Sequence, residues 1–265
     1  MKIAFAAGVV DLIGEGVENV HLGDRVAFVQ DAPAYAEYAI VPASRVLQIP
    51  AALSFDDAAA VLLQGLTAHY LCLSTYPLQP GEWTLIHAAA GGAGQLTVQV
   101  AKICGANVIG TVSTEEKAQV AREVGADEVI IYAQTDFVAE VKRITGGKGL
   151  PVVYDSVGKD TYEGSMNCLA TRGTLVLWGN ASGPVPPIDP LTLSGKGSLY
   201  MTRPTLRHYI ADPAEYQWRV ADVFKWMAEK RLRVRIDKKF ALKDAADAHR
   251  YIESRASKGK ILLTP

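Results

Sequence analysis

Between residues 83 and 177 short apolar runs alternate with segments of helical character, and this alternation limits the fold more than any other feature. The expected strands cover residues 83–88, 107–112, 128–132, 151–154 and 173–177, and the expected helices 94–104, 115–124, 136–144 and 162–170. Strands built almost entirely from Val, Ile and Leu are buried on both faces, which is typical of a parallel sheet covered by helices. The sequence therefore predicts an α/β fold with a doubly wound, Rossmann-type parallel sheet.

The residues on either side predict other structure. Short apolar runs at 7–12 and 25–29 and an alternating run at 35–41 favour strands. Ser54 can cap a helix whose first turn carries two acids, and we expect the apolar run that follows to break into two helices near Gln64-Gly65. A proline-rich loop is expected at 182–190. The final elements are expected to be a helix at 213–230, a strand at 235–240, a helix at 242–255 and a strand at 261–263.

A loop of small residues, His87-Ala-Ala-Ala-Gly-Gly-Ala-Gly94, joins the first predicted strand to its helix. A dinucleotide site needs small residues here for a tight turn, for close approach of backbone amides to the pyrophosphate, and for packing of the helix on the strand. The strict G-x-G-x-x-G pattern is absent, because Ala88 stands where its first glycine would be. The strand before and the helix after the loop nevertheless favour a cofactor site over a purely structural turn.

The end of the second strand bears on which nicotinamide cofactor is bound. NAD sites usually place a carboxylate there, whereas the 2′-phosphate of NADP prefers hydroxyls and a cation. Here Ser113 and Thr114 follow the strand, and Lys117 lies in the first turn of the next helix, which favours NADPH. Glu115 and Glu116 count against NADPH, unless these acids only complement the dipole of the helix that they begin. The alternative for Lys117 is a solvated charge on the surface of that helix.

Composition excludes several classes of function. Lys and Arg total 27 against 28 for Asp and Glu, so the basic excess of nucleic-acid and anionic-membrane binders is missing. The 3 cysteines are far apart and the 5 histidines lack ligand spacing, so neither a disulfide framework nor a metal site is expected. The apolar run at residues 3–10 lacks a signal cleavage site, and no apolar stretch approaches the roughly 20 residues of a membrane span. We expect a cytoplasmic protein.

Eight collinear segments resemble quinone oxidoreductases, the zeta-crystallin-like, zinc-free branch of the medium-chain dehydrogenases. They are LGDRVAF (22–28), LLQGLTAHYL (62–71), IHAAAGGAG (86–94), GTVSTEEKAQVAREVGAD (110–127), VVYDSVGKDT (152–161), WGNASG (178–183), GSLYMTRPTL (197–206) and ESRASKGKILL (253–263). The resemblance implies an NADPH-binding Rossmann domain at 65–205 and a GroES-like, β-rich catalytic domain formed by 1–64 and 206–265. It also implies hydride transfer from NADPH to a quinone or similar electron-poor acceptor, without zinc, in a homodimer.

The resemblance also implies a set of cofactor-binding residues. Those expected at the pyrophosphate are Ala90, Gly91, Gly92, Ala93 and Gly94. Those expected at the 2′-phosphate are Ser113, Thr114, Lys117, Tyr132 and Arg255. Those expected along the nicotinamide half are Thr67, Ser156, Trp178, Gly179, Asn180, Thr202 and Arg203. Trp178 stands at a position that is Phe in the family, and it still offers an aromatic wall.

One departure from the family affects the expected activity. Family members begin several dozen residues earlier, whereas here the match starts near Ala6 and residues 1–5 do not follow the pattern. We therefore expect a catalytic domain that is incomplete at its N-terminus, and we assign no catalytic side chain. Three interpretations remain open: an NADPH-dependent quinone reductase, an NADPH-binding form without full activity that serves a structural or regulatory role, and a reductase of enals or enones on the same fold.

Overall fold

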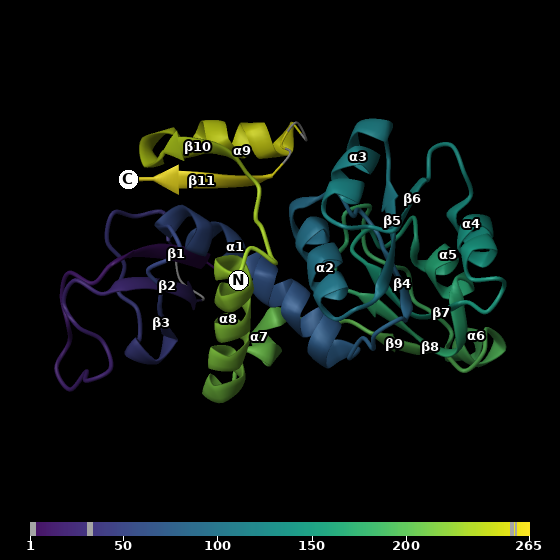
Figure 1. Ribbon diagram of the computed structural model, residues 1–265, viewed down its shortest axis with the longest axis horizontal. Helices are drawn as coiled ribbons and strands as arrows, with labels where there is room; N and C mark the ends of the chain where they lie inside the picture. Colours follow the sequence, from purple (N-terminus) through teal and green to yellow (C-terminus); the bar gives the residue numbers. More distant parts are fainter. Residues whose placement is uncertain (1–3, 31–33, 255–256, 258) are drawn as a thin grey trace. The chain divides into compact units, whose positions relative to one another are not determined.

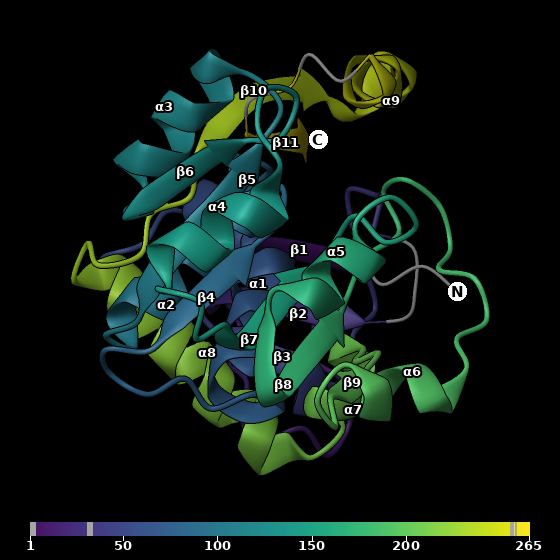
Figure 2. The same cartoon turned by 90° about the vertical axis from the view of Figure 1, so that its right-hand side faces the viewer.

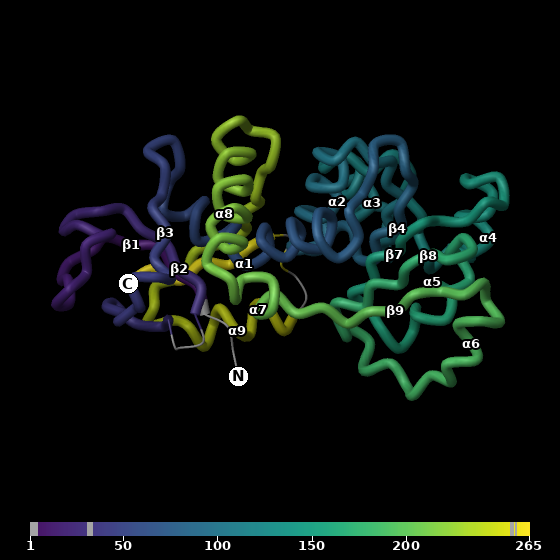
Figure 3. Tube along the Cα trace, turned by 90° about the horizontal axis from the view of Figure 1, so that it is seen from below, coloured from purple at the N-terminus to yellow at the C-terminus, as the bar shows by residue number. Residues whose placement is uncertain are grey.

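The computed structural model describes residues 4–30, 34–254, 257 and 259–265. The chain divides into two compact units, one formed by Met1–Leu66 with Ile210–Pro265 and the other by Thr67–Tyr209. The chain passes from the first unit to the second along one helix and returns after α7 (Leu206–Tyr209), as the trace in Figure 3 shows.

The unit Thr67–Tyr209 is built on a six-stranded sheet with the order β6-β5-β4-β7-β8-β9 (Figure 2). Its strands are β4 (Trp83–Ile86), β5 (Asn107–Val112), β6 (Glu128–Ile131), β7 (Leu150–Asp155), β8 (Leu169–Leu177) and β9 (Tyr200–Thr202). Every neighbouring pair is parallel. The predicted α/β fold with a Rossmann-type sheet is thus confirmed, and the short edge strand β9 is added to it.

Helices cover both faces of this sheet. They are α2 (Gly92–Ile103), α3 (Glu115–Glu123), α4 (Phe137–Ile144), α5 (Tyr162–Asn167) and α6 (Pro190–Gly195). Figure 1 shows α2 and α3 on one face and α4 and α5 on the other. On the second face, Ile109 and Val153 of the strands pack in one buried cluster with Val141 of α4 and Met166 of α5. Burial on both faces explains why the strands read as continuous apolar runs.

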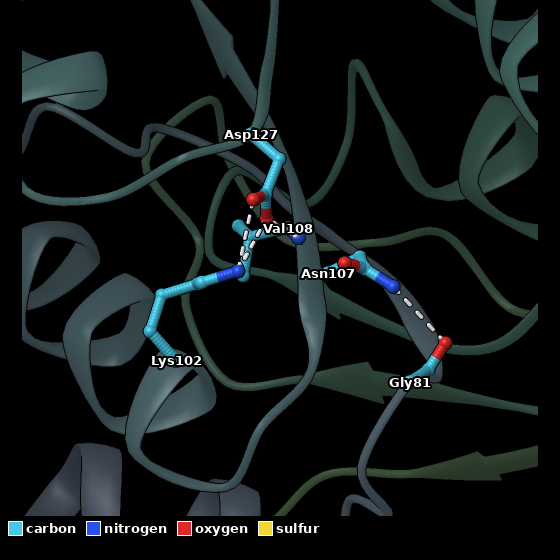
Figure 4. A network of polar contacts seen from close by, with 5 residues as sticks. All are labelled: Gly81, Lys102, Asn107, Val108 and Asp127. Carbon is cyan, nitrogen blue, oxygen red and sulfur yellow. Dashed lines mark hydrogen bonds and ion pairs between the residues drawn. The ribbon is translucent and has the colours of Figure 1, made fainter.

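Polar contacts fix the amino end of the sheet (Figure 4). Lys102, near the end of α2, donates to both carboxylate oxygens of Asp127 at 2.9 and 2.7 Å, and the amide of Val108 donates to the same carboxylate at 2.7 Å. The side chain of Asn107 donates to the carbonyl of Gly81 at 3.0 Å. These bonds tie α2, β5 and the start of β6 together at the edge opposite the strand ends from which a Rossmann fold binds its ligands.

The other unit contains two small sheets. An antiparallel sheet has the order β1 (Ala4–Val9), β2 (Arg25–Gln30), β3 (Val46–Gln48), and β10 (Ile236–Ala241) pairs in parallel with β11 (Lys260–Thr264). This unit also contains η1 (Ala43–Arg45), most of α1 (Phe55–Tyr70), α8 (Pro213–Ala228), η3 (Leu242–Asp244) and α9 (Ala245–Glu253). The expected strand at 35–41 is wrong, because that segment pairs with no strand of the described chain and exposes Tyr38 and Ile40. Alternation alone does not supply a pairing partner.

Helix α1 (Phe55–Tyr70) corrects two expectations. It is continuous through Gly65, where a Cβ would lie 2.9 Å from Val61 Cγ2 and 3.1 Å from Val223 Cγ1, so the glycine permits close packing rather than a break. The irregularity comes later, in the π-helical turn η2 (Leu71–Thr75). The stretch Phe55–Thr75 is long and apolar enough to cross a membrane by length and composition, contrary to our expectation. Of its apolar window 61% is buried in the structure, and core helices of water-soluble proteins meet the same criteria.

Candidate functional site

The loop between β4 and α2 forms a tight, strained turn. The amide of Ala89 donates to the carbonyl of Thr111 at 3.1 Å, and the amide of Gly91 donates to the carbonyl of Ala88 at 2.9 Å. Ala88 has a φ of 52°, which is in the left-handed region that costs a non-glycine residue about 1–2 kcal/mol. Ala88 stands at the position of the first glycine of the dinucleotide pattern, and it has a left-handed backbone conformation that glycine adopts readily.

Two glycines allow this turn to lie close to its neighbours. A Cβ on Gly94 would lie 2.2 Å from the carbonyl oxygen of Ala88, and a Cβ on Gly110 would lie 2.8 Å from the Cβ of Ala89. Within the described chain no side chain caps α2, whose N-cap residue is Gly91. The first amides of α2 are therefore left for another acceptor, beside a backbone cradle that a side chain would fill. These features fit a pyrophosphate group.

The residues expected at the 2′-phosphate gather after β5 and β6. Thr114 caps α3 by accepting from the amide of Lys117 at 3.3 Å, and the amide of Tyr132 donates to the carbonyl of Val112 at 3.1 Å, beside Ser113. Thr114, Lys117 and Tyr132 are exposed. Glu115 pairs with Arg122 at 2.7 Å on the surface of α3, which favours its interpretation as a helix-stabilising acid. Arg255, expected in the same group, lies outside the described residues.

The loops after β7 and β8 pack tightly against each other. A Cβ on Gly179 would lie 2.2 Å from the carbonyl oxygen of Ser156, and the amide of Ala181 donates to that oxygen at 3.2 Å. The amide of Trp178 donates to the carbonyl of Asp155 at 2.9 Å. These contacts bring together Ser156, Trp178, Gly179 and, next in the chain, Asn180.

The other residues expected at the nicotinamide half are positioned by neighbouring elements. The guanidinium of Arg203 donates to the carbonyl of Leu177 at 2.8 Å, just before Trp178. Thr202 ends β9 and pairs with Val176 of β8. Thr67 lies in the last turn of α1, and this turn belongs to the unit Thr67–Tyr209 although the rest of the helix does not. Arg203 and Thr202 thus border the same strand end as Trp178.

A buried polar network lies beneath these loops, and the sequence analysis missed it. The carboxylate of Asp155 accepts from the amides of Val157 at 2.8 Å and Gly158 at 3.0 Å, and from the hydroxyls of Thr161 at 2.7 Å and Ser165 at 2.8 Å. Asp155 is fully buried. One carboxylate therefore holds the loop that carries Ser156, and the only sequence signal was a charged residue at the end of an apolar strand.

His87 extends this network towards β5. Its Nε2 lies 3.0 Å from Ser165 Oγ and its Nδ1 lies 2.8 Å from Thr111 Oγ1. Burial lowers the pKa of His87, and the Asp155 carboxylate opposes that shift only in part. The imidazole is therefore neutral near pH 7, with one ring nitrogen donating and the other accepting. In the core, His87 links β5 to α5.

Two buried polar atoms of the described residues have no hydrogen-bond partner: Nε1 of Trp178 and Oε1 of Gln64. Gln64 lies in α1, in the unit that contains β1, and Trp178 follows β8 in the other unit. Orphaned buried polar atoms are rare in folded proteins and call for an explanation such as an absent ligand. Over the same described part of the chain, no group of three or more His, Cys, Asp or Glu side chains could hold a metal ion.

Comparison with known proteins places these features in a family. Residues 92–224 match the family model described as zinc-binding dehydrogenase. The chain is 47% identical over 263 residues to a quinone oxidoreductase of Salmonella typhimurium, covering 98% of this chain and 80% of that protein. It is 42% identical over 264 residues to a 2-haloacrylate reductase of a Burkholderia species, covering 98% of this chain and 79% of that protein.

Solved structures agree with this assignment. The crystal structure of Escherichia coli quinone oxidoreductase complexed with NADPH superposes with a TM-score of 0.94 at 46% identity, covering 98% of this chain and 81% of that one. The likeness extends over both compact units, so it does not rest on the six-stranded sheet alone. The chain belongs to the quinone oxidoreductase family of the medium-chain dehydrogenase/reductase superfamily.

Proposed function

We propose that this chain is an NADPH-dependent quinone oxidoreductase that transfers a hydride to a quinone or a similar electron-poor acceptor without zinc. The observation that carries the proposal is the backbone cradle at Gly94, which opens beside the uncapped start of α2. The identity to named quinone oxidoreductases and the likeness to one solved with NADPH support it. In this assignment 65–205 is the NADPH-binding domain, and 1–64 with 206–265 form the GroES-like catalytic domain.

The protein's part in such a reaction is to bind, orient and exclude water, while bound NADPH supplies the hydride. We assign the backbone of residues 90–94 to the pyrophosphate, because the amides at a helix start attract anions. The loops after β7 and β8 lie on the other side of β4 from β5 in the sheet order. They would therefore receive the half of the dinucleotide that points away from the adenosine. Ser156, Trp178, Gly179, Asn180, Thr202 and Arg203 are assigned to that half, with Thr67.

The first test is steady-state oxidation of NADPH by the purified chain with a simple quinone. Turnover well above a blank without quinone supports the proposal. Binding of NADPH that raises the melting temperature without any turnover would instead support the alternative of a cofactor-binding protein with a structural or regulatory role. No binding and no turnover would overturn both.

Lys117→Ala tests the assignment of the 2′-phosphate pocket, which also includes Ser113, Thr114, Tyr132 and Arg255. A charge-assisted contact is worth about 1.5–3 kcal/mol, so we expect NADPH to bind roughly tenfold to a hundredfold more weakly. NADH lacks the phosphate, and its affinity should change by less than about twofold. Titration calorimetry with both cofactors gives the comparison, and Lys148→Ala, another exposed lysine of the same unit, is the matched control. Equal losses for NADPH and NADH would refute the assignment.

A second candidate function keeps the cofactor and changes the acceptor. The 42% identity to a protein named 2-haloacrylate reductase favours an activated carbon–carbon double bond as the hydride acceptor. The discriminating measurement is kcat/KM for a quinone, an enal and a 2-haloacrylate under the same conditions. A higher kcat/KM for either alkene than for the quinone would favour this second function.

The association state and location are also proposals. We infer a homodimer and a cytoplasmic protein from membership of the family. Light scattering of the purified chain, with and without NADPH, tests the first, and a monomer under both conditions would refute it.

A further inference from the structure

The proline-rich segment at 182–190 has no role in the proposed function. Four of its residues are prolines: Pro184, Pro186, Pro187 and Pro190. The segment leads from the loop after β8 into α6 as a stretch of chain without helix or strand before Pro190 (Figure 2). Its conformation and its burial indicate what it can bind.

The backbone of this segment is restricted to the polyproline II conformation. A proline ring fixes φ near −65°, and the residue before a proline is kept in the β or polyproline II region. At least one of these restrictions applies to every residue from 184 to 190 except Ile188. Asp189 shows the result, with a φ of −67° and a ψ of 123°. These restrictions and angles indicate a short polyproline II helix over 184–189.

Burial along the segment has the period of such a helix. A polyproline II helix has three residues per turn, so residues three apart share a face. Val185 and Ile188 are half-buried, and Val185 packs on the buried cluster that contains Val153 and Met166. The residues on the other two faces are all exposed, namely Pro184, Pro186, Pro187 and Asp189. One face of the helix therefore lies on the core, and two faces are exposed.

The two ends of the helix are fixed, and the backbone between them is open to new hydrogen bonds. The carbonyl of Gly183 accepts from the amide of Lys159 at 3.2 Å, and the side chain of Asp189 accepts from the amide of Leu191 at 2.9 Å. Within the described chain, the backbone of residues 184–188 makes no hydrogen bond. Its carbonyls can therefore accept from donors on another molecule. Because the helix is already ordered, binding it costs little conformational entropy.

We propose that residues 184–190 are a docking segment for a partner protein that binds polyproline II helices in an aromatic-lined groove. In such grooves aromatic side chains pack on the proline rings, and polar side chains donate to the backbone carbonyls. Asp189 is exposed and is the only charged residue from 184 to 190, so a basic residue of the partner fits that end of the groove. The inference does not depend on NADPH binding or on turnover.

The test titrates the full chain into three purified, isotope-labelled probe domains, one each of the SH3, WW and EVH1 types. Each probe is chosen to carry a basic residue beside its aromatic groove. Nuclear magnetic resonance of the probe gives the dissociation constant and shows which of its residues are perturbed. We expect at least one probe to bind with a Kd below about 1 mM, with shifts in its aromatic groove residues. Binding by none of the three would overturn the inference.

Variants test whether the prolines carry the binding. Removing two rings of one face, by Pro184→Ala together with Pro187→Ala, should weaken binding at least about tenfold. Pro213→Ala is the matched control, because Pro213 is also exposed but begins α8 in the other unit, and it should change the affinity by less than about twofold. Asp189→Asn removes the charge but keeps an acceptor for the amide of Leu191, and it should weaken binding about two- to fivefold at low salt.

Two further outcomes would overturn the inference. Equal affinities of the double proline variant and Pro213→Ala would show that the proline rings do not carry the binding. Conversion of a dimer of the chain into a monomer by the double variant, measured by light scattering, would show that the segment is a contact between two copies of the chain. The double variant should otherwise keep the melting temperature of the wild type, because both substituted residues are exposed.

Discussion

Replacing Gly94 by alanine tests the cradle at the start of α2. The new Cβ would lie 2.2 Å from the carbonyl oxygen of Ala88, 3.0 Å from its carbon and 3.1 Å from Cα of Ala89. Carbon–oxygen contacts are normally about 3.3–3.6 Å, so the loop or the helix must move by roughly 1 Å. The loop resists this movement, because Ala88 already has a φ of 52° and its carbonyl accepts from Gly91 at 2.9 Å.

The expected cost follows from three contributions. Overpacking a tight contact costs about 1–3 kcal/mol. Weakening the Gly91 to Ala88 hydrogen bond costs up to about 1 kcal/mol more, and alanine recovers about 1 kcal/mol because it favours the helix more than glycine does. We therefore expect Gly94→Ala to lower the free energy of unfolding by about 1–3 kcal/mol. NADPH affinity should fall more than tenfold, since a displacement of about 1 Å misaligns the amides that face the pyrophosphate.

The assay needs a signal from the unit Thr67–Tyr209 alone, because two compact units need not unfold together. Hydrogen exchange of peptides from β4 and α2, measured by mass spectrometry, reports the local free energy, and calorimetry reports NADPH binding. Gly195→Ala is the matched control, because Gly195 is also helical and nothing lies within 4 Å of a Cβ built there. The cradle argument is refuted if the amides of β4 and α2 exchange equally slowly in Gly94→Ala and Gly195→Ala and if the two variants bind NADPH with equal affinity.

Two further predictions concern buried charge. The carboxylate of Asp155 accepts from two hydroxyls and two amides, and Asp155→Asn leaves only one accepting oxygen there. The variant should therefore destabilise the unit Thr67–Tyr209 by about 2–5 kcal/mol in urea unfolding. A loss below about 1 kcal/mol would contradict the role of this carboxylate. Burial lowers the pKa of Lys260, whose ammonium lies 4.3 Å from the centre of the Phe5 ring, from 10.5 to about 8. The folded protein releases this proton before the unfolded chain does, so the free energy of unfolding should rise with pH between about 8 and 10.5. Lys260→Met should abolish that rise and add about 1–3 kcal/mol at pH 7, whereas a wild-type stability independent of pH over this range would refute the expectation.

Much of the unit Thr67–Tyr209 follows from local sequence. The strands at β4, β5 and β7 are apolar on both faces, so their burial is evident without knowing their neighbours. Ser54 and Thr114 accept from amides of Asp57 and Lys117 at their helix starts, and such caps involve residues only three apart. The small residues of the β4–α2 loop likewise predict a tight turn from neighbouring residues alone, and the structure has one there. Local signals of this kind also underlie the resemblance to the family.

The tertiary structure decided what depends on partners that are distant in sequence. The segment at 35–41 alternates like a strand but pairs with no strand of the described chain, whereas the three-residue β9 pairs with the neighbouring β8. Gly65 lies inside a continuous helix, where it permits close packing of Val223. His87 contacts both Thr111 and Ser165, and Ser165 is 78 residues after His87 in the chain. The sequence by itself determined the sheet, the tight β4–α2 turn and the family, because their signals are short-range. Only the folded chain shows that Asp155 anchors a loop and that the Trp178 donor lacks a partner among the described residues, because hydrogen bonding and burial depend on all the groups that surround an atom.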